Sequence, residues 1–201
     1  MPSAAMPEGG SGPAASWRDR VNYRVVTSVS GQVRYVPAFP PHGVFVNYRR
    51  EDAGPYARLL QFKLGERFPT VPVFIDLDSI EAGADFAEAI KSGVESCAVL
   101  VALIGAKWLT ITDEDGRRRL DDPDDYVRYE IRTALERDVR VIPVLVDGAR
   151  VPKQQQLPDD LQRLARLNAL EMSWARLDYD AFRLMDAIQR VLESGNAGPE
   201  E

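Results

Sequence analysis

The sequence predicts an α/β domain in which helices cover both faces of a parallel β-sheet. Short apolar runs alternate along the chain with longer amphipathic segments, which is the pattern of repeated strand–helix units. The apolar runs are continuous and do not alternate with polar residues, as expected of strands that are buried on both faces. The chain has 201 residues, of which 45% are hydrophobic and 28% charged. This profile indicates one globular domain with an appendage.

The predicted strands coincide with these apolar runs. They cover residues 44–46, 73–75, 98–104 and 139–146, with a weaker fifth strand at 168–172. Because helical segments separate the strands and the strands are buried on both faces, we expect a parallel sheet that is covered by helices.

The predicted helices are recognised by apolar residues three or four positions apart, which form one stripe along a helix. The five stripes are Tyr56, Leu59, Leu60, Leu64; Phe86, Ile90, Val94; Val127, Ile131, Ala134, Leu135; Leu161, Leu164, Leu167; and Phe182, Met185, Ile188, Val191, Leu192.

The ends of the chain differ from this domain. Residues 1–16 are mostly Pro, Gly, Ala and Ser, so they bury too little surface to offset the entropy of ordering and are expected to be disordered. Residues 17–43 form an extension, in which two short β-rich runs around Ser30-Gly31 suggest a hairpin. The main domain then spans 44–193, and 194–201 is a second disordered tail.

Composition limits the location and the partners of the protein. No apolar run is long enough to span a bilayer, and the first 16 residues lack the features of a secretory signal. Cys97 is the single cysteine, so it cannot form an internal disulfide. The net charge of −6 gives no reason to expect nucleic acid as the main partner. We therefore expect a cytoplasmic protein that binds neither membrane nor nucleic acid.

Polar side chains follow the predicted strands, where ligands bind in open parallel sheets. The first strand continues into Asn47, Tyr48, Arg49 and Arg50, and the third into a polar loop at 107–125. Neither a dinucleotide-binding glycine motif nor a P-loop is present. The third strand ends without the Asp of a phospho-receiver domain.

Two other candidate sites have simpler structural explanations. A nucleophilic pair of His42 and Cys97 is disfavoured, because a cysteine at the start of a buried strand is usually a small apolar residue. The acidic run 121–125 could hold a divalent cation, but carboxylates at this position favour capping of the following helix. With one His and one Cys, we expect no metal site.

Tyr126 and Glu130 are four residues apart and so share one helix face, at the edge of the buried stripe. The spacing alone does not assign them a function, because a surface glutamate paired with an arginine would give the same pattern.

Four segments in order carry a resemblance to the TIR (Toll/interleukin-1 receptor) domain family, in its bacterial, NAD-cleaving branch. They are VFVNYRR at 44–50, VFIDLDSIEAG at 73–83, YVRYEI at 126–131 and VIPVL at 141–145. The resemblance covers roughly residues 44–193. It implies a flavodoxin-like fold with five parallel strands in the order 2-1-3-4-5.

The resemblance also implies a function and a site. Glu130 matches the glutamate that is essential for cleaving NAD+, and Tyr126 stands where this branch typically has Trp. Tyr48 and Arg49 would contact the nicotinamide–ribose or the diphosphate, and Tyr126 would stack on the ligand. Asp76 and Glu81 would bind ribose hydroxyls or orient loops, and for Asp76 a loop-capping role is equally plausible. For Arg50 a phosphate contact and a solvated loop are equally plausible.

The implied activity is that of an NAD+ glycohydrolase or ADP-ribosyl cyclase, a bacterial defence effector activated by self-assembly. NAD+ is then the substrate, and no cofactor is expected. Self-association would use the loop at 78–86, with an upstream activator protein as a further partner. The alternative is a non-catalytic adaptor that recruits other TIR domains, for which the same fold would serve.

Overall fold

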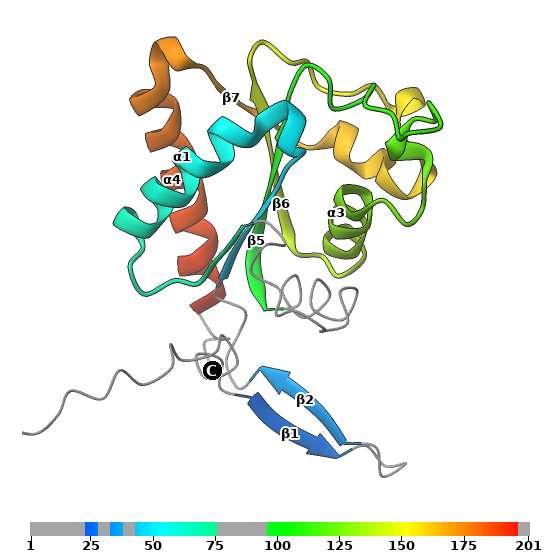
Figure 1. Cartoon of the computed structure of the whole chain (residues 1–201). Coiled ribbons are helices and arrows are strands. Elements are labelled where there is room, and N and C mark those ends of the chain that lie inside the picture. Colours follow the sequence, from blue (N-terminus) through cyan, green and yellow to red (C-terminus); the bar gives the residue numbers. More distant parts are fainter. Residues whose placement is uncertain (1–22, 28–32, 38–42, 76–95, 197–201) are drawn as a thin grey trace, which may run out of the picture. The chain divides into compact units, whose positions relative to one another are not determined.

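The computed structural model of the protein describes residues 23–27, 33–37, 43–75 and 96–196 (Figure 1). The chain divides into two units after Phe39. In the first unit, β1 (Tyr23–Thr27) pairs with β2 (Val33–Pro37) in antiparallel register, with Tyr23 opposite Pro37. The predicted tail at 1–16 and the predicted helix containing Phe86, Ile90 and Val94 lie outside the described residues.

The second unit is built on a five-stranded parallel sheet with the order β4-β3-β5-β6-β7. Counted from β3, this is the order 2-1-3-4-5, so the predicted flavodoxin-like topology is confirmed. The strands are β3 (Gly43–Asn47), β4 (Val73–Ile75), β5 (Cys97–Ile104), β6 (Arg140–Val146) and β7 (Leu170–Met172).

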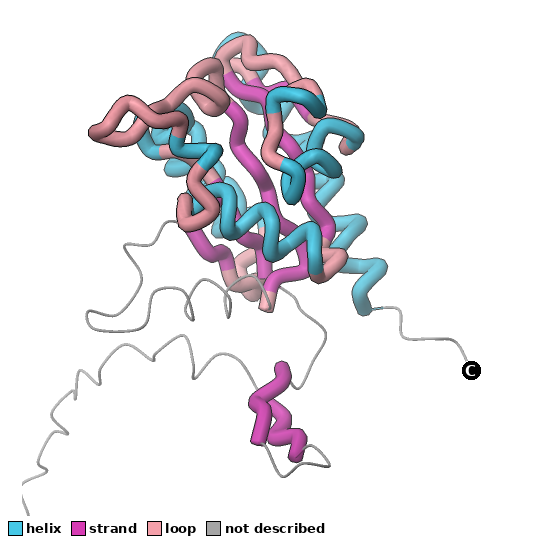
Figure 2. The backbone as a smooth tube through the Cα atoms, turned by 90° about the vertical axis from the view of Figure 1, so that its right-hand side faces the viewer, coloured by secondary structure: helices cyan, strands magenta, loops and turns pink. Residues whose placement is uncertain are grey.

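Helices cover both faces of this sheet. On one face lie α1 (Arg50–Arg67) and α4 (Leu177–Asn196), and on the other lie α3 (Tyr126–Glu136) and the 3-10 helix η5 (Asp159–Arg166) (Figures 1 and 2). Shorter 3-10 turns are η3 (Arg119–Asp121), η4 (Gln154–Gln156) and η6 (Trp174–Arg176). Helix α4 continues past the predicted domain end at residue 193.

The strands supply side chains to two cores, one on each face of the sheet. In β5, Val99, Val101 and Leu103 face α1 and α4, whereas Leu100 and Ile104 face α3 and η5. All five side chains are buried. The continuous apolar run of this strand is therefore explained by burial on both sides.

Two sequence predictions need correction. Phe182 was expected in the buried stripe of α4, but its side chain is 69% exposed. The buried face of α4 runs through Ala181, Leu184 and Ile188, and a residue next to Ala181 lies about 100° away around the helix. The fourth predicted helix is the 3-10 helix η5, which fits the three-residue spacing of Leu161 and Leu164.

A buried tyrosine ties α1 to the loops that follow β6 and β7. The Tyr56 hydroxyl donates a hydrogen bond of 2.7 Å to Asp147 Oδ1, and the Tyr56 ring lies 4.7 Å from the Trp174 ring. Burial, and then the bond to Asp147, raise the pKa of Tyr56 to about 12. The hydroxyl therefore stays a donor at physiological pH.

Within the described residues, no helix combines the length and the apolar character needed to cross a bilayer.

Gly105, directly after β5, is predicted to be intolerant of a side chain. A Cβ there would lie 2.5 Å from the Asp52 carboxylate, which accepts a hydrogen bond of 2.8 Å from the Lys107 amide. We expect Gly105→Ala to lower the free energy of unfolding by about 1–2 kcal/mol, measured by urea denaturation, because Asp52 must move and give up this bond.

Gly65→Ala is the matched control. Gly65 lies on the exposed side of α1, and a Cβ there meets no atom within 4 Å. This change should stabilise the helix by about 0.5–1 kcal/mol. Equal urea midpoints for the Gly105 variant and the wild type would contradict the packing argument.

Candidate active site

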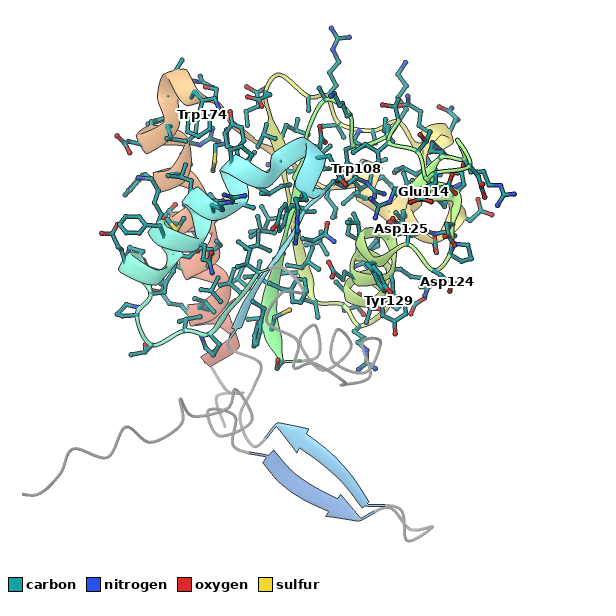
Figure 3. All side chains as sticks on the ribbon, viewed as in Figure 1. Trp108, Glu114, Asp124, Asp125, Tyr129 and Trp174 are labelled. Atoms are coloured by element: carbon teal, nitrogen blue, oxygen red, sulfur yellow. The ribbon has the colours of Figure 1, made fainter. Side chains whose placement is uncertain are left out.

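The candidate site lies at the carboxyl edge of the sheet, where β3 and β5 end and where α1 and α3 begin. Asn47 is the last residue of β3 and pairs in register with Ala102 of β5. Figure 3 shows Asp125 at the upper end of α3, with Trp108 in the neighbouring loop. In open parallel sheets this edge is where ligands bind.

Glu130 is a buried carboxylate at this edge. Its side chain is only 6% exposed, although α3 carries it on the border of its apolar face. Asn47 Nδ2 donates a hydrogen bond of 2.6 Å to Glu130 Oε2 and another of 3.1 Å to the Val127 carbonyl oxygen. Burial of a carboxylate is costly unless donors compensate for lost water. This environment differs from that of a solvated surface glutamate.

A buried ion pair stands beside this contact. The two Nη atoms of Arg49 each donate a 3.0 Å hydrogen bond to one carboxylate oxygen of Asp125, so the pair is bidentate. Asp125 is the N-cap of α3 and accepts the Arg128 backbone N–H at 3.0 Å. Arg119 Nε lies 3.2 Å from the same carboxylate. One carboxylate thus joins the short segment between β3 and α1, the 3-10 turn η3 and the first turn of α3.

The acidic run 121–125 is occupied by capping and turn contacts. Besides the cap formed by Asp125, the Asp122 carboxylate accepts the Asp124 backbone N–H at 2.9 Å. Across the described part of the chain, no three His, Cys, Asp or Glu side chains are grouped so that they could hold a metal ion.

Several buried polar atoms at this edge have no hydrogen-bond partner. They are Asn47 Oδ1, Arg49 Nε, Asp52 Oδ2 and Trp108 Nε1, and they account for all but one of the buried, unpartnered side-chain atoms among the described residues. Buried polar groups are normally satisfied, and exceptions concentrate where water or a ligand contributes. Four such atoms lie at the edge of the sheet where ligands bind in open parallel folds.

The remaining predicted site residues are placed as follows. Tyr126, at the start of α3, is 45% exposed, and Tyr48 is half-buried after β3. Arg49, expected at the nicotinamide–ribose or the diphosphate, has both Nη atoms on Asp125. Asp76, Glu81 and the predicted self-association loop at 78–86 lie outside the described residues.

Cys97 behaves as the apolar residue that the sequence favoured. It is completely buried at the start of β5, and burial raises the pKa of its thiol to about 12. A thiolate nucleophile at neutral pH is therefore disfavoured. His42, the other member of the disfavoured pair, lies outside the described residues.

Sequence reasoning missed the role of Asn47 and the ion pair of Arg49. Asn47 and Arg49 are polar residues that follow a buried apolar run, and this pattern marks a position worth inspecting but does not identify the partner. Their contacts on α3 lie 83 and 76 positions away along the chain. Only the docking of α3 against β3 reveals them.

Fold and site together define a class: a doubly wound, parallel α/β domain with a buried, hydrogen-bonded glutamate at the carboxyl edge of its sheet. The chain belongs to the TIR domain family, whose model matches residues 44–185. The predicted family is thereby confirmed.

Similar proteins agree with this assignment. The chain is 31% identical over 151 residues to the NAD(+) hydrolase sarm1 of Drosophila melanogaster, a match that covers 74% of this chain and 10% of that protein. It is 26% identical over 129 residues to the NAD(+) hydrolase tir-1 of Caenorhabditis elegans, covering 64% of this chain and 12% of that protein. The chain thus spans about a tenth of the length of these relatives.

A solved structure with the same fold is that of the TIR domains of the activated Roq1 resistosome. The TM-score is 0.53 at 12% sequence identity, and the match covers 74% of this chain and 98% of that one. At this identity the likeness concerns the fold alone.

Loss of Arg49 is predicted to destabilise the domain. In Arg49→Met, the buried Asp125 carboxylate keeps the Arg119 contact and the Arg128 backbone N–H but loses its bidentate partner, so we expect the free energy of unfolding in urea to fall by about 3 kcal/mol. The double variant Arg49→Met/Asp125→Asn should recover part of this loss, because Asn carries no charge and still caps a helix.

Arg183→Met, on the exposed face of α4, is the matched control and should change stability by less than about 0.5 kcal/mol. If Arg49→Met were as harmless as this control, the buried pair would not have the structural role described.

Proposed function

We propose that this TIR domain cleaves the bond between nicotinamide and ribose in NAD+, with Glu130 as the catalytic carboxylate. The observation that carries the proposal is the burial of the Glu130 carboxylate at the carboxyl edge of the sheet, held there by Asn47. Two relatives that bear the name NAD(+) hydrolase support the same activity.

The chemistry requires only one carboxylate. Cleavage passes through an oxocarbenium-like transition state, in which positive charge develops on the ribose. Most glycosidases need a second acid to protonate the departing oxygen. Nicotinamide is a pyridinium while bound to the ribose, so it takes the bonding electron pair and leaves as a neutral molecule. Water then adds to the ribose carbon and loses a proton, which gives ADP-ribose.

In this reaction, Glu130 stabilises the charge that develops on the ribose. An anion that is already oriented in a site with little water stabilises such charge without reorganisation during the reaction. Alternatively, the same carboxylate forms a bond to the ribose carbon, and a nucleophile then displaces the carboxylate. Displacement by water gives ADP-ribose, and displacement by the adenine of the same ADP-ribosyl group gives a cyclic product.

The other residues of the proposed site bind the substrate. Tyr126 offers an aromatic face near Glu130 on the same helix, and Tyr48 follows β3 at the same edge. Asp76 and Glu81 are proposed to contact ribose hydroxyls. Arg49 would have to exchange Asp125 for a diphosphate before it could bind one, so we assign it first to holding α3.

We further propose that the enzyme is a cytoplasmic effector of bacterial defence that needs no cofactor and is activated by self-association through the loop at 78–86. An upstream activator would trigger this assembly. These proposals follow from the resemblance to the NAD-cleaving branch of the family.

The test is release of nicotinamide from NAD+ by concentrated protein. Glu130→Gln keeps the shape of the side chain but removes its charge, and we expect turnover to fall by about 10³-fold. Glu136→Gln, an exposed change at the end of the same helix, is the matched control and should react like the wild type. Equal turnover by the Glu130 variant and this control would remove Glu130 from the mechanism.

If the wild type releases no nicotinamide even when assembled, the alternative of a non-catalytic TIR–TIR adaptor is favoured. Association without turnover, measured by light scattering, would distinguish that function from an inactive preparation.

A further inference from the structure

The side chain of Asn47 is buried and hydrogen-bonded at the end of β3. It is 1% exposed, and its backbone is part of the ladder between β3 and β5. Asparagine has only two side-chain torsions, so fixing it costs little conformational entropy. Asn47 is therefore suited to holding a neighbouring side chain in a fixed position relative to the sheet.

The two hydrogens of the Asn47 amide are both donated to α3. One goes to the Val127 carbonyl oxygen and the other to Glu130 Oε2. A carbonyl oxygen can only accept, so the bond to Val127 fixes which end of the amide faces the helix. The second hydrogen then points at the Glu130 carboxylate. The backbone of α3 thus sets the orientation of the amide that holds the carboxylate.

This donation restricts the orientation of Glu130. The contact of 2.6 Å limits rotation of the carboxylate. A fixed orientation suits a group that must face a developing positive charge in a defined place.

The neighbouring ion pair between Arg49 and Asp125 gives α3 a second point of attachment. Arg49 lies two residues beyond Asn47 and holds Asp125, the N-cap of α3. The end of β3 therefore contacts α3 at its cap and again one turn later, at Val127 and Glu130. Two points of attachment define both the position and the rotation of the helix.

We propose that Asn47 is a positioning residue for the cleavage of NAD+, which orients the Glu130 carboxylate toward the ribose. This inference rests on the proposed function. Because both amide hydrogens of Asn47 are donated to Val127 and Glu130, we expect its loss to affect the catalytic step more than substrate binding.

The test compares Asn47→Ala, Asn47→Ser and the wild type by steady-state kinetics with NAD+. We expect kcat of Asn47→Ala to fall by about 10- to 100-fold, with KM changed by less than about twofold, because a displaced catalytic group impairs reaction and not binding. The Ser variant keeps one short donor, and its kcat should lie between those of the other two proteins.

Asn168→Ala removes an amide from an exposed position before β7 and should leave both constants unchanged. Urea unfolding of each variant identifies losses due to instability, and the Ser variant serves if the Ala variant does not fold. Wild-type kcat in Asn47→Ala, or a rise in KM alone, would overturn the inference while leaving the proposed function standing. A wild-type protein that releases no nicotinamide would refute both.

Discussion

The structure depends on a buried polar junction between the end of β3 and the start of α3. Arg49 pairs with Asp125, and Asn47 bonds to Glu130 and to the Val127 carbonyl. Buried charges are tolerated only when their partners are correctly placed, since a displaced partner leaves an uncompensated charge. The junction adds directional hydrogen bonds to the apolar packing between helix and sheet. It therefore sets the register of α3 against the sheet.

This junction also links stability to function. The groups that hold α3 in place lie on the same two segments as the group proposed to carry out the reaction. Loss of Arg49 should destabilise the domain, whereas substitution of Asn47 should chiefly change the geometry of Glu130. Asp52 and Trp108, at the same edge, each have one buried polar atom without a partner among the described residues. Water or a ligand commonly satisfies polar atoms of this kind.

The sequence predicted the sheet and most of its helices, because continuous apolar runs and helical stripes report burial directly. It predicted that the acidic run 121–125 caps the following helix, since carboxylates before a helix are a local signal, and Asp125 is the residue that forms the cap. It did not reveal the exposure of Phe182, because a single apolar residue beside a buried stripe looks the same whether or not another element covers it. Nor did it reveal the partners of Asn47 and Arg49, which are set by tertiary docking over long sequence separations. Glu130 was an intermediate case. Its spacing along the helix predicted a position at the edge of the core, but only the structure identified Asn47 as its partner.

The most direct test of the account is a structure of the assembled Glu130→Gln variant with NAD+ bound. The account predicts that the side chain at position 130 lies within about 4 Å of the ribose carbon that carries nicotinamide, close to the reacting distance expected of an aligned catalytic group. NAD+ bound away from the carboxyl edge of the sheet, or a side chain at position 130 turned away from that ribose, would contradict it.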